Sequence, residues 1–146
     1  MPKHIRPHDG RPDPGTAREL VPVRPVHEAL TRQRLPYFLG ISAATAGSRG
    51  LSMHMVVIPP GGVAEPHRHQ DFETAIYVLE GRVETRYGAG LRRAVISEAG
   101  DFLFIPPDVP HQAVNLSATE AARAIVARND PNEQERVLPY DPATGD

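Results

Sequence analysis

The segment Gly61–Gly81, GGVAEPHRHQDFETAIYVLEG, decides the fold and points to the chemistry of this chain. His67 and His69 are separated by one residue, so on an extended strand their side chains point to the same side. Glu73 follows shortly after them. Neutral imidazole and carboxylate together suit divalent first-row metals. The segment therefore predicts a metal site next to a strand, Thr74 to Glu80, that is rich in β-forming residues.

A third histidine lies in a second stretch, Gly100–Asn115, which reads GDFLFIPPDVPHQAVN. The two stretches together resemble the paired motifs of the cupin superfamily. The first motif, G-x5-H-x-H-x3/4-E-x6-G, is matched by Gly61, His67, His69, Glu73 and Gly81. The second, G-x5-P-x-G-x2-H-x3-N, is matched by Gly100, Pro106, His111 and Asn115. Two motifs in the right order, each with nearly the family's internal spacing, are far more specific than one.

The resemblance implies an all-β fold, the double-stranded β-helix or jelly-roll barrel of a small single-domain cupin. It implies one divalent transition metal (Fe, Mn, Ni, Zn, Co or Cu) inside one end of the barrel. The implied ligands are His67, His69, Glu73 and His111. It also implies a homodimer, paired through edge strands and an N-terminal arm.

The chain departs from the family pattern at two places. Glu73 fits the spacing after His69, but its distance to Gly81 is then one residue too long. Counting back from Gly81 puts Thr74 at the carboxylate position instead. Either a bulge swings Glu73 inward, which we favour, or the three histidines bind the metal alone. Asp108 stands where the second motif has glycine, and aspartate tolerates turn conformations.

Length and composition bound the remaining possibilities. The 146 residues fit one domain, which we place at residues 26–146 behind a proline-rich, extended N-terminal arm, residues 1–25. A net charge of -2 gives no electrostatic case for nucleic acid or anionic lipid as a partner. The sequence contains no cysteine and no apolar run long enough to span a bilayer. We therefore expect no membrane association and a cytoplasmic protein.

Short strands separated by Gly and Pro turns fill the chain from Leu35 onward, as expected for an antiparallel sandwich or barrel. The run from Phe102 to Ile105 is apolar at every position, which indicates a strand buried on both faces. His54 either faces the pocket or sits between the sheets with one hydrogen bond. The candidate substrate-pocket residues are His54, Ile76, Val78, Phe102, Phe104 and Gln112.

Two functions of different class fit these observations. The first is a metalloenzyme, dioxygenase-like or isomerase-like, acting on a small organic substrate chelated at a mononuclear metal. The second is a non-catalytic module that binds a sugar or another small molecule, with a regulatory role. No catalytic residue is assigned, because the serines have no adjacent histidine and no phosphate-binding loop is present.

Overall fold

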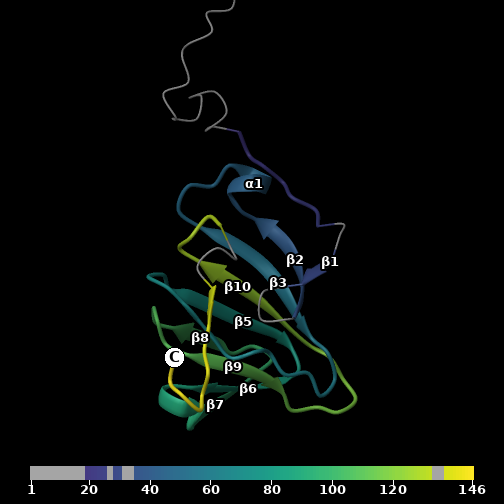
Figure 1. Cartoon of the computed structure of the whole chain (residues 1–146). Helices are drawn as coiled ribbons and strands as arrows, with labels where there is room; N and C mark the ends of the chain where they lie inside the picture. Colours follow the sequence, from purple (N-terminus) through teal and green to yellow (C-terminus); the bar gives the residue numbers. More distant parts are fainter. Residues whose placement is uncertain (1–18, 26–27, 31–34, 133–136) are drawn as a thin grey trace, which may run out of the picture.

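The computed structural model describes residues 19–25, 28–30, 35–132 and 137–146. Within these ranges the chain is almost entirely β, and two antiparallel sheets face each other (Figure 1). The helical parts are short: α1 spans Ala43–Ala46, and the 3-10 helix η2 spans Ala89–Leu91. The all-β jelly-roll prediction is confirmed. The described strands form no ladder from one sheet to the other, so the sheets form a sandwich that is not closed into a barrel.

The strands divide unevenly between the two sheets. The larger sheet has the order β1 (Glu28–Leu30), β2 (Pro36–Ile41), β3 (Ser52–Ile58), β10 (Ala122–Arg128), β5 (Thr74–Glu80), β8 (Phe102–Ile105). The smaller sheet has the order β11 (Val137–Pro139), β4 (His67–His69), β9 (His111–Asn115), β6 (Arg82–Tyr87), β7 (Arg93–Glu98). The histidine-bearing strands of the two motifs are thus brought together in the smaller sheet, where β4 pairs with β9.

The core lies between the sheets and follows the two-residue alternation of each strand. On β3, Val56 and Ile58 are buried while Met53 is 44% exposed on the outer side. On β10, Ala124 and Val126 are buried in the same way. Full burial of one Val or Ile side chain stabilises the folded state by about 1.5–3 kcal/mol relative to leaving it exposed. This alternation fixes which side chains enter the space between the sheets.

The prediction that Phe102–Ile105 is buried on both faces is wrong. Phe102 is 81% exposed and Phe104 is 58% exposed, whereas Ile105 is buried. β8 is the last strand of the larger sheet, and its outer face is open in the part of the chain that the structure describes. A run that is apolar at every position hides this alternation, because both faces look alike in the sequence.

Two motif residues hold strand ends in place. Gly81, between β5 and β6, has a φ of 88°, and a Cβ there would lie 2.8 Å from the Cβ of Ala122. Only glycine fits both the backbone conformation and this close approach. Asn115, which is 4% exposed, donates its side-chain amide to the carbonyls of Ile58, Pro59 and Glu120. These hydrogen bonds connect the end of β9 to the end of β3 and to the loop before β10.

Most of the predicted N-terminal arm, residues 1–18, lies outside the described residues. Residues 19–25 form no helix or strand. The division into an arm and a domain stays a prediction. None of the helices among the described residues is long and apolar enough to cross a membrane.

Candidate metal centre

Three histidine side chains meet on the inner face of the smaller sheet. His67 of β4 and His111 of β9 are direct register partners, and His69 lies two residues further along β4. All three are buried, and one nitrogen from each lies within 4.8 Å of the others. Among the described residues this is the group with the geometry of a metal site. We call His67, His69 and His111 the histidine cluster.

Backbone carbonyls orient two of these rings. Nδ1 of His67 donates to the carbonyl of Glu65 at 2.8 Å, and Nδ1 of His111 donates to the carbonyl of Val109 at 2.9 Å. A carbonyl oxygen only accepts, so the proton is on Nδ1 and the Nε2 lone pair faces the cluster. Carbonyl partners of this kind are usual behind metal-binding histidines.

The cluster is uncharged at neutral pH. Burial lowers the pKa of His67 to about 3 and that of His111 to about 4. Burial, followed by the positive charge of Arg128, holds the pKa of His69 well below its usual range. Metal ligation requires neutral imidazole. Three neutral, buried imidazoles facing one point therefore fit a divalent transition metal.

The structure does not bring Glu73 to this cluster. Its side chain is exposed, and its backbone N–H donates to Oδ1 of Asn129 at 2.8 Å. Phe72 is buried against the ring of His69, so the alternation turns Glu73 outward and Thr74 inward. No bulge reverses this order, and Thr74, counted from Gly81, takes the inward position that the sequence-based preference gave to Glu73.

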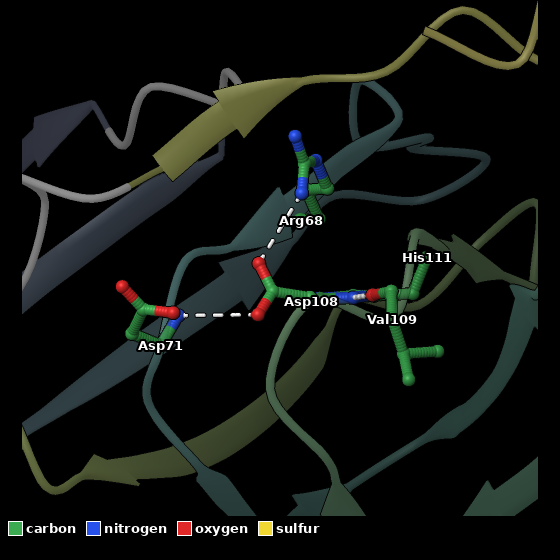
Figure 2. A network of polar contacts seen from close by, with 5 residues as sticks. All are labelled: Arg68, Asp71, Asp108, Val109 and His111. Carbon is green, nitrogen blue, oxygen red and sulfur yellow. Dashed lines mark hydrogen bonds and ion pairs between the residues drawn. The ribbon is translucent and has the colours of Figure 1, made fainter.

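The turn before β9 is held by Asp108, the residue that replaces the motif glycine. Its φ is 62°, in the left-handed region that favours glycine. Its carboxylate accepts from Nη1 of Arg68 at 3.2 Å, and lies 3.5 Å from the backbone N of Asp71 (Figure 2). Its own N–H donates to the carbonyl of His69 at 2.9 Å. Asp108 thus links the turn that positions His111 to the strand that carries the other two histidines.

A cavity of about 70 Å³ lies between the sheets and reaches the cluster at His67 and His111. Its described wall is mostly aliphatic, with Thr74 and Arg128 as polar members on the opposite sheet. One water molecule needs roughly 10–15 Å³ of such volume, so the cavity holds roughly five waters or a ligand of similar size.

Only some of the pocket residues predicted from the sequence line the cavity. Ile76 and Val78 line the cavity. His54 is buried, with its ring 5.4 Å from that of Tyr37, and it is not part of the described cavity wall. Gln112 donates to the carbonyl of Ala64 instead of facing the cavity. Phe102 and Phe104 point outward, and their neighbours Leu103 and Ile105 line the cavity in their place.

Arg128 was missed by the sequence interpretation. It is 5% exposed, lines the cavity, and its Nη2 lies 3.4 Å from Nε2 of His69. The signal that marks it is the alternation of β10, in which Ala122, Ala124 and Val126 face inward and Arg128 takes the next inward position. A charged residue at an inward-facing position of an otherwise apolar strand is a candidate functional residue, because charged side chains are rarely buried.

Comparisons with known proteins agree with this arrangement. The family model of the cupin domain matches residues 54–128. Germin-like protein subfamily T member 3 of Arabidopsis thaliana is 37% identical over 86 residues, which are 56% of this chain and 37% of that protein. The chain thus spans well under half the length of the curated relative it matches.

Two solved structures are similar in fold. The polyketide cyclase RemF from Streptomyces resistomycificus has a TM-score of 0.68 at 24% identity, with 83% of this chain and 85% of that chain covered. A recombinant oxalate oxidase in complex with glycolate has a TM-score of 0.60 at 25% identity, with 70% and 54% covered. The first likeness concerns the fold alone.

Proposed function

Since the chain belongs to the cupin family, we propose that it binds one divalent transition metal ion through His67, His69 and His111 and acts on a small organic molecule there. The observation that carries the proposal is the convergence of three buried imidazole rings, one nitrogen of each lying within 4.8 Å of the others. Imidazole ligands suit Fe, Ni, Zn, Co and Cu, whereas Mn prefers a carboxylate ligand, which this group of described residues does not include. Glu73 is not included, because its side chain is exposed.

A site with these three ligands could support a reaction at the metal ion. A metal ion held by His67, His69 and His111 would polarise a bound oxygen or activate a bound water. The protein's own contribution is the cavity. Its aliphatic wall excludes bulk water and limits the substrate to a few heavy atoms. Backbone carbonyls behind His67 and His111 keep both rings oriented during turnover.

The reaction class we propose is that of a dioxygenase-like or isomerase-like metalloenzyme. The likeness to an oxalate oxidase, itself an enzyme of a small organic acid, supports oxidative chemistry. The non-catalytic binding module is the alternative outcome, because sequence and geometry assign no general acid or base.

The test begins with elemental analysis of the protein purified without oxygen. We expect close to one transition metal ion per chain. The loaded protein is then screened for oxygen consumption and for isomerisation with catechols, diketones and sugar acids. A protein without a bound metal contradicts the proposal. A protein that keeps its metal and binds compounds from the screen without turnover supports the binding module.

A homodimer and a cytoplasmic location also remain parts of the proposal. The outer face of the larger sheet favours pairing with a second copy, because Phe102 and Phe104 are exposed there beside Leu79, which is 41% exposed. The ring of Phe102 lies 4.7 Å from that of Tyr77, which extends this apolar patch onto β5. Ion pairs lie on the outer faces of both sheets, Arg123–Glu80 on the larger and Arg86–Glu84 on the smaller, where Ile96 is 50% exposed. Exposed apolar patches of this kind mark protein interfaces.

A further inference from the structure

The two strands that carry the histidine cluster pair with each other at one position. This register pair of β4 and β9 is His67 with His111. His69 lies two residues further along β4, beyond the pair, so the ladder between the two strands does not fix its position relative to His111. The placement of the third imidazole relative to the second motif therefore depends on other contacts.

Asp108 makes contacts of this kind with both its main chain and its side chain. Its N–H donates to the carbonyl of His69 at 2.9 Å. Its carboxylate accepts from Nη1 of Arg68, the residue between the two histidines of β4, at 3.2 Å (Figure 2). The next residue, Val109, supplies the carbonyl that accepts from Nδ1 of His111. Asp108 thus connects the turn that orients His111 directly to the strand that carries His69.

The side-chain contact is a feature of this chain and not of the cupin motif. Asp108 stands where the motif has glycine, and a glycine N–H can bond to His69 but provides no carboxylate for Arg68. The backbone of Asp108 keeps a φ of 62°, a conformation that glycine adopts most easily. Aspartate there carries a conformational cost, and the contacts of its carboxylate give a reason for accepting it.

We propose that the ion pair of Asp108 with Arg68 positions the histidine cluster, so that the metal affinity of this chain depends on two side chains outside the cavity. The proposal rests on the metal site proposed above. The ion pair holds the turn before His111 against β4 and limits how far the imidazoles of the two motifs move apart. Neither Arg68 nor Asp108 lines the described cavity, so both act through the histidines and are positioning residues.

The size of the effect follows from the exposure of the pair. The side chain of Arg68 is 39% exposed and that of Asp108 is 42% exposed. Exposed ion pairs change an equilibrium constant by at most about fivefold, and salt screens them. We therefore expect Asp108→Gly and Arg68→Met each to weaken Co²⁺ binding by about two- to fivefold at low salt. The difference from the wild type should narrow at high salt.

The test is a double-mutant cycle on the full chain, with the dissociation constant for Co²⁺ measured by competition with a chelator. The double variant of Arg68→Met and Asp108→Gly should bind Co²⁺ about as weakly as either single variant, because one substitution already breaks the pair. Glu84→Gln is the matched control and should keep the wild-type affinity. It breaks the ion pair with Arg86, which joins two residues of β6 on the outer face of the same sheet.

The signs of the two single variants separate positioning from a simple effect of charge. Asp108→Gly removes a negative charge and Arg68→Met removes a positive one, so charge alone would weaken Co²⁺ binding in the first and strengthen it in the second. Weaker binding by both variants supports the proposal. Wild-type affinity in either single variant, tighter binding by Arg68→Met, additive losses in the double variant, or an equal loss in Glu84→Gln overturns it.

A wild-type protein that takes up no Co²⁺ defeats the metal site alone, and the metal-free protein then decides the positioning role. NMR measures the solvent-exchange rate of the Nδ1 proton of His111, whose carbonyl partner belongs to the turn that Asp108 holds. Exchange faster by about threefold or more in Asp108→Gly and Arg68→Met than in Glu84→Gln supports the proposal, and equal rates overturn it. Should Asp108→Gly fail to fold, Arg68→Met alone decides, and wild-type affinity or exchange in that variant overturns the proposal.

Discussion

His67 and His111 are direct register partners on β4 and β9, and their ring centroids are 4.3 Å apart. They come from two motifs that are distant in the sequence, and pairing of the two strands is what brings them together. Their Nδ1 atoms are engaged by backbone carbonyls, which leaves the Nε2 atoms for a shared ion.

Replacing His111 with alanine should remove most of the bound metal, because two imidazoles bind a divalent ion far more weakly than three. Elemental analysis of the anaerobically purified variant measures this loss. Glu73→Gln is the matched control and should keep the wild-type metal content, since Glu73 is exposed and outside the cluster. Metal loss in Glu73→Gln together with retention in His111→Ala would refute the ligand assignment.

The stability of the metal-free protein should fall as the pH drops below about 6.5. Burial lowers the pKa of His54 and His67 to about 3 and that of His111 to about 4, so the folded state takes up fewer protons than the unfolded state in this window. The stabilisation is fully present above the unfolded pKa. Each histidine contributes a slope of up to about 1.4 kcal/mol per pH unit.

Urea unfolding of the chelator-treated protein at pH 7.5, 6 and 5 measures this slope. His54→Gln removes one titrating group without touching the proposed ligands, so its slope should be smaller by up to about 1.4 kcal/mol per pH unit. A free energy of unfolding that stays constant between pH 7.5 and 5 would contradict the burial of neutral histidines.

The backbone conformation of Asp108 predicts a difference between two substitutions. Asp108→Val forces a β-branched residue to a φ of 62° and should cost about 2 kcal/mol of folding stability. Asp108→Gly relieves the backbone and loses an exposed ion pair to Arg68, worth about 0–1 kcal/mol. Denaturant unfolding compares the two, and equal losses would show that the carboxylate contacts, not the backbone, decide stability.

The exposed phenylalanines predict the mode of self-association. The double variant Phe102→Ser and Phe104→Ser should shift the molar mass measured by light scattering from a dimer to a monomer, while the metal content stays the same. Ile96→Ser, an exposed position on the smaller sheet, is the control and should not change the molar mass. A wild-type protein that is monomeric at all concentrations would contradict the predicted homodimer.

The sequence was sufficient for the jelly-roll fold and for the histidines that come together. His67 and His69 share a strand face by spacing, and the order of the two motifs placed His111 next to them. The residue at the family's carboxylate position could not be predicted by counting. Counting forward from His69 gives Glu73, whereas counting back from Gly81 gives Thr74. The burial of Phe72, a tertiary packing effect, decides that Thr74 faces inward and Glu73 outward.

The exposure of the outer face of β8 and the burial of Arg128 in the cavity wall were missed for different reasons. Phe102 and Phe104 belong to a uniformly apolar run, in which no polar residue marks the outer side. Arg128 does follow the alternation of its strand, but only the pairing of β10 between β3 and β5 places it in the cavity wall.

β4, which carries His67 and His69, pairs with β9 in register only at His67, and along all three of its residues with β11. Residues 137–139 therefore complete the backbone hydrogen bonding of the strand that supplies two of the three imidazoles. Truncations, protease cuts or affinity tags near Val137 would disturb the histidine cluster through these backbone hydrogen bonds, although no ring of the cluster belongs to that segment. Leaving residues 137–139 unchanged keeps the partner strand of His67 and His69 in place.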